Sequence, residues 1–135
     1  MVSKLSIAGL YAIADTQYLD DTRLIDTVTQ AITGGARIIQ YRDKKHAAPE
    51  RARQASELPA LCRRHGVLFI VNDDVTLAKA TRADGVHLGR KDVPLAEARK
   101  LLGAQAIIGV SCYNELARAE AAEKHGADYV AFGRF

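Results

Sequence analysis

Residues 66–72, Gly66-Val67-Leu68-Phe69-Ile70-Val71-Asn72, form a short apolar run between a glycine and a polar side chain. The same pattern returns in five further segments, residues 10–15, 35–40, 84–89, 106–111 and 127–133. Short continuous runs rich in valine and isoleucine are typical of strands that are buried on both faces. The runs therefore predict six buried strands that start near residues 10, 38, 68, 85, 107 and 129, about 24 residues apart on average.

Helical patterns fill the intervals between these runs, with apolar side chains recurring at helical spacing. Pro49 suits a first helical turn, whereas Pro59 lacks an amide donor and should interrupt the helix that begins at Pro49. Gly34, Gly35 and Gly103 follow helical patterns and can end them. The expected helices cover residues 24–32, 49–58, 95–102 and 116–122, with a short helix within residues 74–80.

Strands that alternate with helices predict an α/β fold built of parallel βα units. An open doubly wound sheet and a (β/α)₈ barrel both fit this alternation. The barrel is favoured because the carboxyl ends of all barrel strands converge on one mouth, and polar side chains gather at those ends, namely Gln40, Arg42, Asn72, Asp73 and Ser111. We therefore expect residues 1–135 to be a single domain, a parallel (β/α)₈ TIM barrel of which about the first six strands are present.

Composition excludes several classes of protein. Hydrophobic residues make up 48% and charged residues 26% of the chain, which is the profile of a globular domain rather than a disordered or collagenous one. No apolar run approaches the ~20 residues of a membrane helix, and residues 1–10 lack a secretory signal. The net charge of +3 is too small to indicate a nucleic-acid partner. Cys62 and Cys112 are far apart in sequence and are expected to be free thiols, so we predict a cytoplasmic protein.

The segment Gln40-Tyr41-Arg42-Asp43-Lys44 ends the second predicted strand. In an extended chain Gln40, Arg42 and Lys44 share one face. One amide and two cations that point the same way would suit a phosphate or a diphosphate. A solvated loop between strand and helix explains the same residues, and the pattern alone leaves both interpretations open.

Carboxylates follow the next two strands. Asp73 or Asp74 could bind Mg²⁺, which prefers hard oxygen ligands, or could cap the following helix. Asp92 could be a second metal ligand or could cap the helix that follows Pro94. At the end of the fifth strand, the Ser111 hydroxyl could donate to a phosphate oxygen or could cap a helix. Together these residues predict a magnesium–diphosphate site that stabilises charge on a leaving diphosphate.

Other residues and motifs carry less chemistry. His87 is interpreted as a packed strand histidine, and Cys112 as inert because no base partner lies beside it in sequence. The chain has no G-x-G-x-x-G, Walker A or H-E-x-x-H motif. Nothing therefore indicates a nucleotide cofactor or a zinc hydrolase.

Five ordered blocks resemble the thiamine-phosphate synthase (thiamine-phosphate pyrophosphorylase) family. The blocks are Gln40-Tyr41-Arg42-Asp43-Lys44, Val71-Asn72-Asp73, Gly85-Val86-His87-Leu88-Gly89 followed by Asp92, Ile108-Gly109-Val110-Ser111, and Gly126-Ala127-Asp128-Tyr129. The resemblance implies a (β/α)₈ barrel and a transferase of thiamine biosynthesis. Such an enzyme joins hydroxymethylpyrimidine from its diphosphate to thiazole phosphate, which gives thiamine phosphate and diphosphate.

The resemblance also implies roles for individual residues. Mg²⁺ would be held by Asp73 and Asp92. Arg42, Lys44 and Ser111 would act in catalysis by positioning and charge stabilisation rather than as a strong base. The substrate-binding residues would be Tyr11, Gln40, Arg42, Lys44, Asn72 and Ser111.

The family continues beyond the matched blocks, with a Thr- and Lys-containing loop and two further strands that grip the phosphates. We therefore expect the 135-residue chain by itself to have little or no turnover. One alternative is a thiazole tautomerase-like relative on the same barrel. Another is a non-catalytic barrel fragment that self-associates, as a homo-oligomer or through exposed barrel edges. On the first interpretation the partners are small-molecule substrates, with neither nucleic acid nor membrane.

Overall fold

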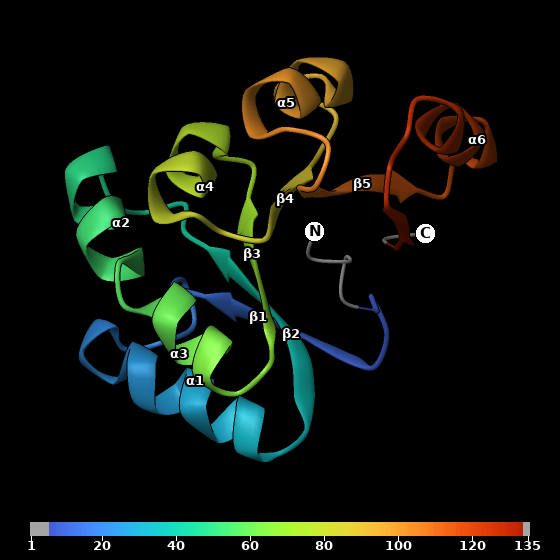
Figure 1. Ribbon diagram of the computed structural model, residues 1–135. Coiled ribbons are helices and arrows are strands. Elements are labelled where there is room, and N and C mark those ends of the chain that lie inside the picture. Colours follow the sequence, from blue (N-terminus) through green and yellow to red (C-terminus); the bar gives the residue numbers. More distant parts are fainter. Residues whose placement is uncertain (1–5, 134–135) are drawn as a thin grey trace.

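The computed structural model describes residues 6–133, in which strands and helices alternate along the chain (Figure 1). A short 3₁₀ turn, η1 (Asp21–Arg23), precedes the first α-helix. The strands are β1 (Leu10–Asp15), β2 (Ala36–Arg42), β3 (Leu68–Asn72), β4 (Gly85–Leu88), β5 (Ile107–Tyr113) and β6 (Tyr129–Phe132). The helices are α1 (Leu24–Thr33), α2 (Ala48–Ala55), α3 (Leu58–Arg64), α4 (Val75–Thr81), α5 (Leu95–Leu102) and α6 (Leu116–Lys124).

All six strands pair in parallel, in the order β1-β2-β3-β4-β5-β6. The order has no switch point, which a doubly wound sheet would require. The sheet curves and carries the helices along its outer side (Figure 1). Within the described residues β1 and β6 are edge strands, so the sheet is an open half-barrel and matches part of a TIM barrel. The predicted barrel architecture is confirmed.

Proline and glycine end the helices where the sequence indicates. Pro59 lies in the first turn of α3, where its missing amide donor costs nothing, so the predicted interruption separates α2 from α3. Gly103 follows α5 with φ of 95°, a conformation that side chains with a Cβ rarely adopt. None of the helices within residues 6–133 is long and apolar enough to cross a membrane.

Alternate residues of β2, β3 and β5 pack into clusters on opposite sides of the sheet. The larger core lies between the sheet and the helices and includes Ile39, Phe69 and Val71. A smaller cluster on the inner side contains Ile38, Leu68, Ile70 and Ile107, with Tyr11 and Tyr129 packed against it. Because the side-chain direction alternates, the residue that ends each strand on the inner side points toward the barrel mouth.

Both cysteines are free and buried. Burial raises the pKa of Cys62 to about 12 and also raises that of Cys112. The thiols therefore stay protonated and unreactive at neutral pH, in agreement with the inert role predicted for Cys112.

Candidate active site

A cleft of about 600 Å³ lies at the carboxyl ends of β2 to β5. All the predicted site residues except Tyr11 line it. The structure therefore brings together side chains from four strand ends, although Gln40 and Ser111 are 71 residues apart in sequence. Its lining consists of Ile13, Gln40, Arg42, Lys44, Asn72, Asp73, His87, Gly89, Arg90, Lys91, Asp92, Ser111 and Tyr113.

Strand β2 delivers Gln40 and Arg42 to the cleft, and Lys44, two residues after the strand ends, lines the same cleft, as the period of two predicts. Arg42 is partly exposed, and its Nη1 atom lies 3.8 Å from Oδ2 of Asp15 on β1. Lys44 forms an ion pair with Asp73, which follows β3. Both cations thus remain open to the cleft, where a phosphate could bind them.

The two carboxylates after β3 have different partners. Asp74 caps α4, because its Oδ1 accepts a hydrogen bond from the amide of Leu77 at 2.9 Å, and its Oδ2 accepts from Arg51 at 3.0 Å. Asp73 instead faces the cleft and accepts from the Asn72 amide at 3.3 Å. Asp73 has φ of 55°, an uncommon value for a residue other than glycine, and this turn directs its side chain away from the cap position. The capping role that the sequence left open thus belongs to Asp74, whereas metal binding by Asp73 stays a prediction.

Asp92 does not cap α5, which begins after Pro94 without a side-chain cap. Its Oδ2 accepts a hydrogen bond from the amide of Gly89 at 2.6 Å, which ties the loop after β4 to the cleft. Asp73 and Asp92 thus bring two carboxylates from neighbouring loops to one cleft.

This donor set fits Mg²⁺. Within residues 6–133 no group of three or more His, Cys, Asp or Glu side chains could hold a metal ion by itself. Magnesium is commonly bound through one or two carboxylates, with water and substrate phosphate completing its coordination. Asp73 and Asp92 beside Arg42 and Lys44 match that pattern, and we treat them as candidate ligands.

A row of hydrogen bonds crosses the inner side of the sheet behind the cleft. Gln40 Nε2 donates to the hydroxyl of Tyr11 at 2.8 Å, and this oxygen lies 2.6 Å from the hydroxyl of Tyr129. The Tyr129 oxygen lies 2.9 Å from Nδ1 of His87, whose Nε2 lies 2.7 Å from Oγ of Ser111. Tyr11 therefore does not line the cleft but contacts Gln40, which does. A role of Tyr11 in substrate binding stays a prediction.

His87 has more than the packing role that the sequence suggested. It is buried in strand β4, yet it lines the cleft and contacts Ser111. Burial lowers the pKa of its imidazole, so the ring is neutral at neutral pH. Burial also raises the pKa of Tyr11 and Tyr129, so both hydroxyls keep their protons. Spacing did not reveal this histidine's contacts because they come from β5 and β6.

Sequence reasoning also missed Arg90, Lys91 and Tyr113 in the cleft lining. The Arg90 guanidinium lies 4.6 Å from the centre of the Tyr113 ring and pairs with Glu115. Tyr113 has φ of 56°, which is strained for an aromatic residue and occurs at the end of β5 beside the cleft. The available signal was the pair of cations that directly precedes Asp92.

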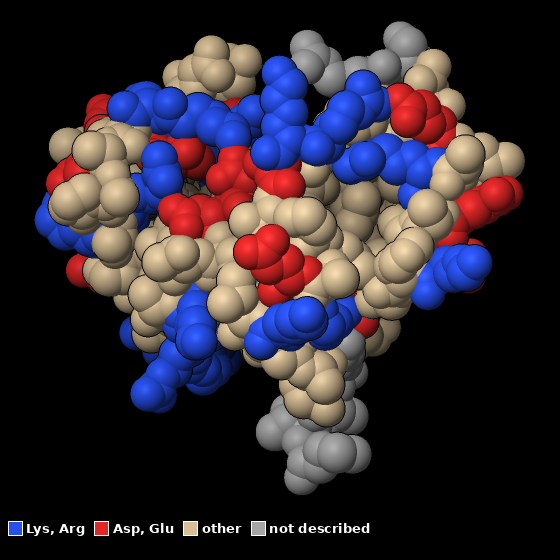
Figure 2. Space-filling model, turned by 90° about the horizontal axis from the view of Figure 1, so that it is seen from above, with Lys and Arg blue, Asp and Glu red and all other residues tan. Residues whose placement is uncertain are grey.

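The surface charge is mixed rather than uniformly basic. On the face drawn in Figure 2, Lys and Arg side chains form a row with Asp and Glu side chains between them. This interleaving suits small anionic ligands held by a few cations better than a long polyanion.

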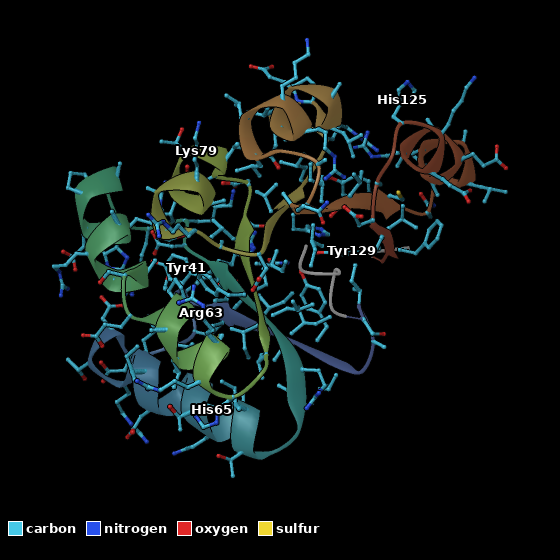
Figure 3. All side chains as sticks on the ribbon, in the orientation of Figure 1. Tyr41, Arg63, His65, Lys79, His125 and Tyr129 are labelled. Atoms are coloured by element: carbon cyan, nitrogen blue, oxygen red, sulfur yellow. The ribbon has the colours of Figure 1, made fainter. Side chains whose placement is uncertain are left out.

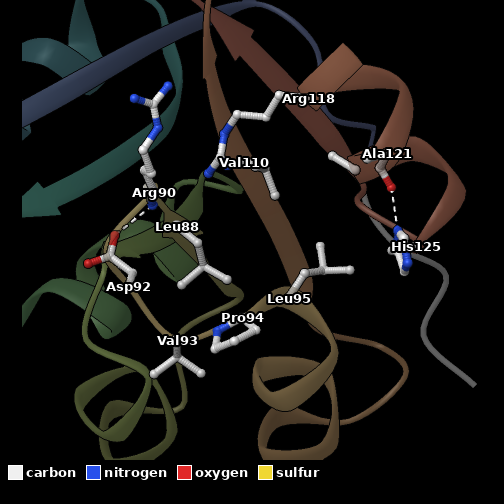
Figure 4. Close-up of a pocket in the computed structure, with 12 residues that line it drawn as sticks. Leu88, Arg90, Asp92, Val93, Pro94, Leu95, Val110, Arg118, Ala121 and His125 are labelled. Carbon is white, nitrogen blue, oxygen red and sulfur yellow. Dashed lines mark hydrogen bonds between the residues drawn. The ribbon is translucent and has the colours of Figure 1, made fainter. Parts of the chain in front are cut away.

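A second hollow of about 300 Å³ lies on the outer side of the sheet, between α5 and α6 (Figure 4). Leu88, Val110 and Leu95 form its apolar wall. His125 at its rim is hydrogen-bonded to the carbonyl of Ala121 at 2.6 Å. No convergent set of predicted site residues lines this hollow, so we place the candidate chemistry in the larger cleft.

Comparison with known proteins links this geometry to a family. A family model described as thiamine monophosphate synthase matches residues 10–135. The thiamine-phosphate synthase of Nitrosococcus oceani is 54% identical over 129 residues, which cover 96% of this chain and 59% of that protein. That of Chromobacterium violaceum is 57% identical over 127 residues, covering 94% of this chain and 61% of the relative.

Solved structures show the same relation. A thiamine phosphate pyrophosphorylase from Pyrococcus furiosus matches with a TM-score of 0.84 and 38% identity, covering 93% of this chain and 59% of that chain. One from Bacteroides thetaiotaomicron matches with a TM-score of 0.69 and 16% identity, covering 95% of this chain and 59% of that chain, and supports the fold alone. The chain thus spans about 60% of the length of the relatives it matches.

Proposed function

The chain belongs to the thiamine monophosphate synthase family, and we propose that its cleft serves the transfer of hydroxymethylpyrimidine from its diphosphate to thiazole phosphate. The products of that reaction are thiamine phosphate and diphosphate. The single observation that carries the proposal is the convergence of Asp73, Asp92, Arg42 and Lys44 on one cleft at the strand ends. Two carboxylates and two cations together fit a magnesium–diphosphate group.

In this proposal the described residues bind and orient the diphosphate. Asp73 and Asp92 would hold Mg²⁺, which would supply charge neutralisation for a leaving diphosphate. Arg42 and Lys44 donate to its oxygens, and the charge-assisted bonds strengthen as negative charge develops there. When the ligand binds, Lys44 exchanges its contact with Asp73 for a phosphate oxygen. Ligand binding therefore breaks the ion pair between Lys44 and Asp73.

The remaining site residues orient the pyrimidine end of the substrate. Gln40 and Asn72 offer amide groups to the cleft, and Ser111 offers a hydroxyl. We assign catalytic roles to Arg42, Lys44 and Ser111, since they would touch the substrate. No strong base is needed because departure of diphosphate, rather than proton removal, starts this reaction.

We further propose that the partners are small anionic molecules and not nucleic acid or a membrane, and that the protein works in the cytoplasm. The mixed charge on the face drawn in Figure 2 supports the assignment of small anionic partners. Association into a homo-oligomer through the open edges of β1 and β6 is also proposed, because exposed edges can pair with other chains. Sedimentation of the purified chain tests it, and a well-folded monomer would contradict it.

Isothermal titration of the chain with hydroxymethylpyrimidine diphosphate, with and without Mg²⁺, tests the proposed function. We expect the binding to depend on Mg²⁺. The substitutions Asp73→Asn and Asp92→Asn should each weaken the affinity about 10- to 100-fold. Glu120→Gln, on the exposed side of α6, removes the same charge elsewhere and should leave binding unchanged. Binding that is equally tight without Mg²⁺, or in both aspartate variants, would overturn the assignment of the ligands.

A further inference from the structure

The row Gln40–Tyr11–Tyr129–His87–Ser111 links side chains from β2, β1, β6, β4 and β5. We propose that this row runs in one direction, from Gln40 to Ser111. It would hold His87 as the tautomer protonated at Nε2 and leave the Ser111 hydroxyl hydrogen free to donate to a ligand. His87 and Tyr129 are then positioning residues, and Ser111 is an obligatory donor. Only the ligand part of this inference rests on the proposed function.

The direction follows from which groups have protons to give. Gln40 presents its Nε2 atom to Tyr11, and an amide nitrogen only donates, so the Tyr11 oxygen accepts. The Tyr11 hydrogen is then available to the Tyr129 oxygen at 2.6 Å. In this direction the Tyr129 hydroxyl donates to Nδ1 of His87, which lies 2.9 Å from the Tyr129 oxygen.

An Nδ1 that accepts a hydrogen bond carries no proton. In a neutral imidazole the proton is then on Nε2, which donates to Oγ of Ser111 at 2.7 Å. The oxygen of Ser111 is occupied as an acceptor, so its own hydrogen points elsewhere. Ser111 lines the cleft, where that hydrogen meets a phosphate oxygen or a ring nitrogen of the ligand.

If the hydrogen bonds ran from Ser111 to Gln40, Ser111 would be positioned as a nucleophile instead of a donor to the ligand. If the Tyr11 hydroxyl donated to Gln40, each later bond would reverse, and His87 would accept the proton of Ser111. An imidazole that accepts from a serine hydroxyl is the arrangement of an activated nucleophile. The contact of Gln40 through Nε2 favours the proposed direction over this one, and the proposed transfer reaction needs a donor and not a nucleophile at this position.

The packing around Tyr129 fixes the position of its ring in the row. Its ring stacks on His87 with centroids 5.5 Å apart and meets Tyr11 edge-on at 5.7 Å. Gly109 on β5 makes room for it, because a Cβ at that residue would lie 2.0 Å from the Cζ atom of Tyr129. Figure 3 shows Tyr129 on the side of the sheet away from α1 to α4, whereas Tyr41 lies toward α2 and α3.

Nuclear magnetic resonance of the ¹⁵N-histidine-labelled chain at neutral pH tests the direction without any ligand. Correlations between ring nitrogens and carbon-bound protons report which nitrogen of His87 is protonated, and His87→Gln identifies the signals. We expect a protonated Nε2 and an unprotonated Nδ1. A proton on Nδ1 would overturn the proposal.

Tyr129→Phe keeps the ring but removes the hydroxyl that donates to His87. We expect the two tautomers to mix in this variant, while Tyr18→Phe, which changes a tyrosine that is 78% exposed, keeps the wild-type tautomer. An unchanged tautomer in Tyr129→Phe would show that the row does not set it. Far-ultraviolet circular dichroism and the other histidine signals confirm that each variant is folded.

Titration with hydroxymethylpyrimidine diphosphate and Mg²⁺ tests the ligand part separately. Ser111→Ala and Tyr129→Phe should each weaken binding about 3- to 10-fold, the range for one hydrogen bond. Wild-type binding together with unaltered affinity in Ser111→Ala would overturn the donor role of Ser111. No binding by the wild-type chain would instead contradict the proposed function, whereas the tautomer result stands independently.

Discussion

Residues 40–44 present two faces whose polar groups lie in different environments. On the outer face, Tyr41 donates to Gln54 of α2, and the side chain of Asp43 is completely buried. On the inner face, the side chains of Arg42 and Lys44 are 36% and 49% exposed. The end of β2 and the two residues after it therefore form a closed polar network on one side and present two partly exposed cations on the other.

The difference lies in how completely each charge is satisfied. Asp43 accepts from Thr16, from the amide and ring of His46 at 3.1 and 2.6 Å, and from Nε of Arg51 at 3.2 Å. Burial by itself would raise the pKa of Asp43, but these hydrogen bonds outweigh it and lower the pKa to about 2. Among residues 6–133, each inner cation has one carboxylate within ion-pair distance, Asp15 for Arg42 and Asp73 for Lys44. The network around Asp43 stabilises the fold, whereas Arg42 and Lys44 keep exposed donors that the proposed function assigns to a ligand.

Removing Asp43 should have the largest effect on stability. Asp43→Ala leaves Arg51 and His46 without their shared carboxylate, and breaking a buried pair in this way costs about 3–5 kcal/mol. Urea denaturation should show that loss in the free energy of unfolding, whereas Glu120→Ala on the exposed side of α6 should stay within about 0.5 kcal/mol. A loss for Asp43→Ala as small as that of the control would mean that the network contributes little.

The same network should make stability depend on pH. The pKa of Asp43 is about 2 in the fold and near 3.9 in the unfolded chain. Its contribution, about 2–3 kcal/mol, is therefore complete above pH ~4 and lost as the pH falls through ~2. We would measure urea midpoints between pH 2 and 7 in the wild type and in Asp43→Asn. The two proteins should differ more above pH ~4 than near pH ~2.

His46 acts with the opposite sign. Its hydrogen bond to Asp43 raises the pKa of the imidazole, so its contribution is present below the unfolded value and lost as the pH rises through the raised one. The advantage of the wild type over Asp43→Asn should thus be greatest between pH ~4 and ~6. A constant difference across the whole range would contradict the assignment of both groups.

On the inner face the expected effect is on affinity rather than on stability. Lys44→Ala should weaken the binding of inorganic diphosphate with Mg²⁺ about 10-fold, since a charge-assisted hydrogen bond contributes about 1.5–3 kcal/mol. Lys45→Ala is the matched control, because its ammonium pairs with Asp21 at 3.2 Å on the outer side. Calorimetric titration of both variants distinguishes the faces, and equal losses would show that only net charge matters.

Much of this comparison could be predicted from sequence, because local rules decide it. The period of two places Gln40, Arg42 and Lys44 together, and proline and glycine mark the helix ends. The roles of His87 and Tyr129 could not be predicted in this way. They depend on β4 and β6 meeting across the inner side of the curved sheet, 42 residues apart, and on the space left by Gly109.

Asp73 and Asp74 repeat the contrast between the two faces on a smaller scale. Asp74→Ala removes the cap of α4 and should lower the free energy of unfolding by about 1 kcal/mol without changing diphosphate binding. Asp73→Asn should do the reverse, because asparagine tolerates the φ of 55° at this position while losing the charge that would hold Mg²⁺. Urea denaturation and calorimetric titration of both variants should therefore give opposite patterns for adjacent residues. If Asp74→Ala weakened ligand binding as much as Asp73→Asn, the loop after β3 would act as one unit. The division between a structural carboxylate and a binding carboxylate would then be wrong.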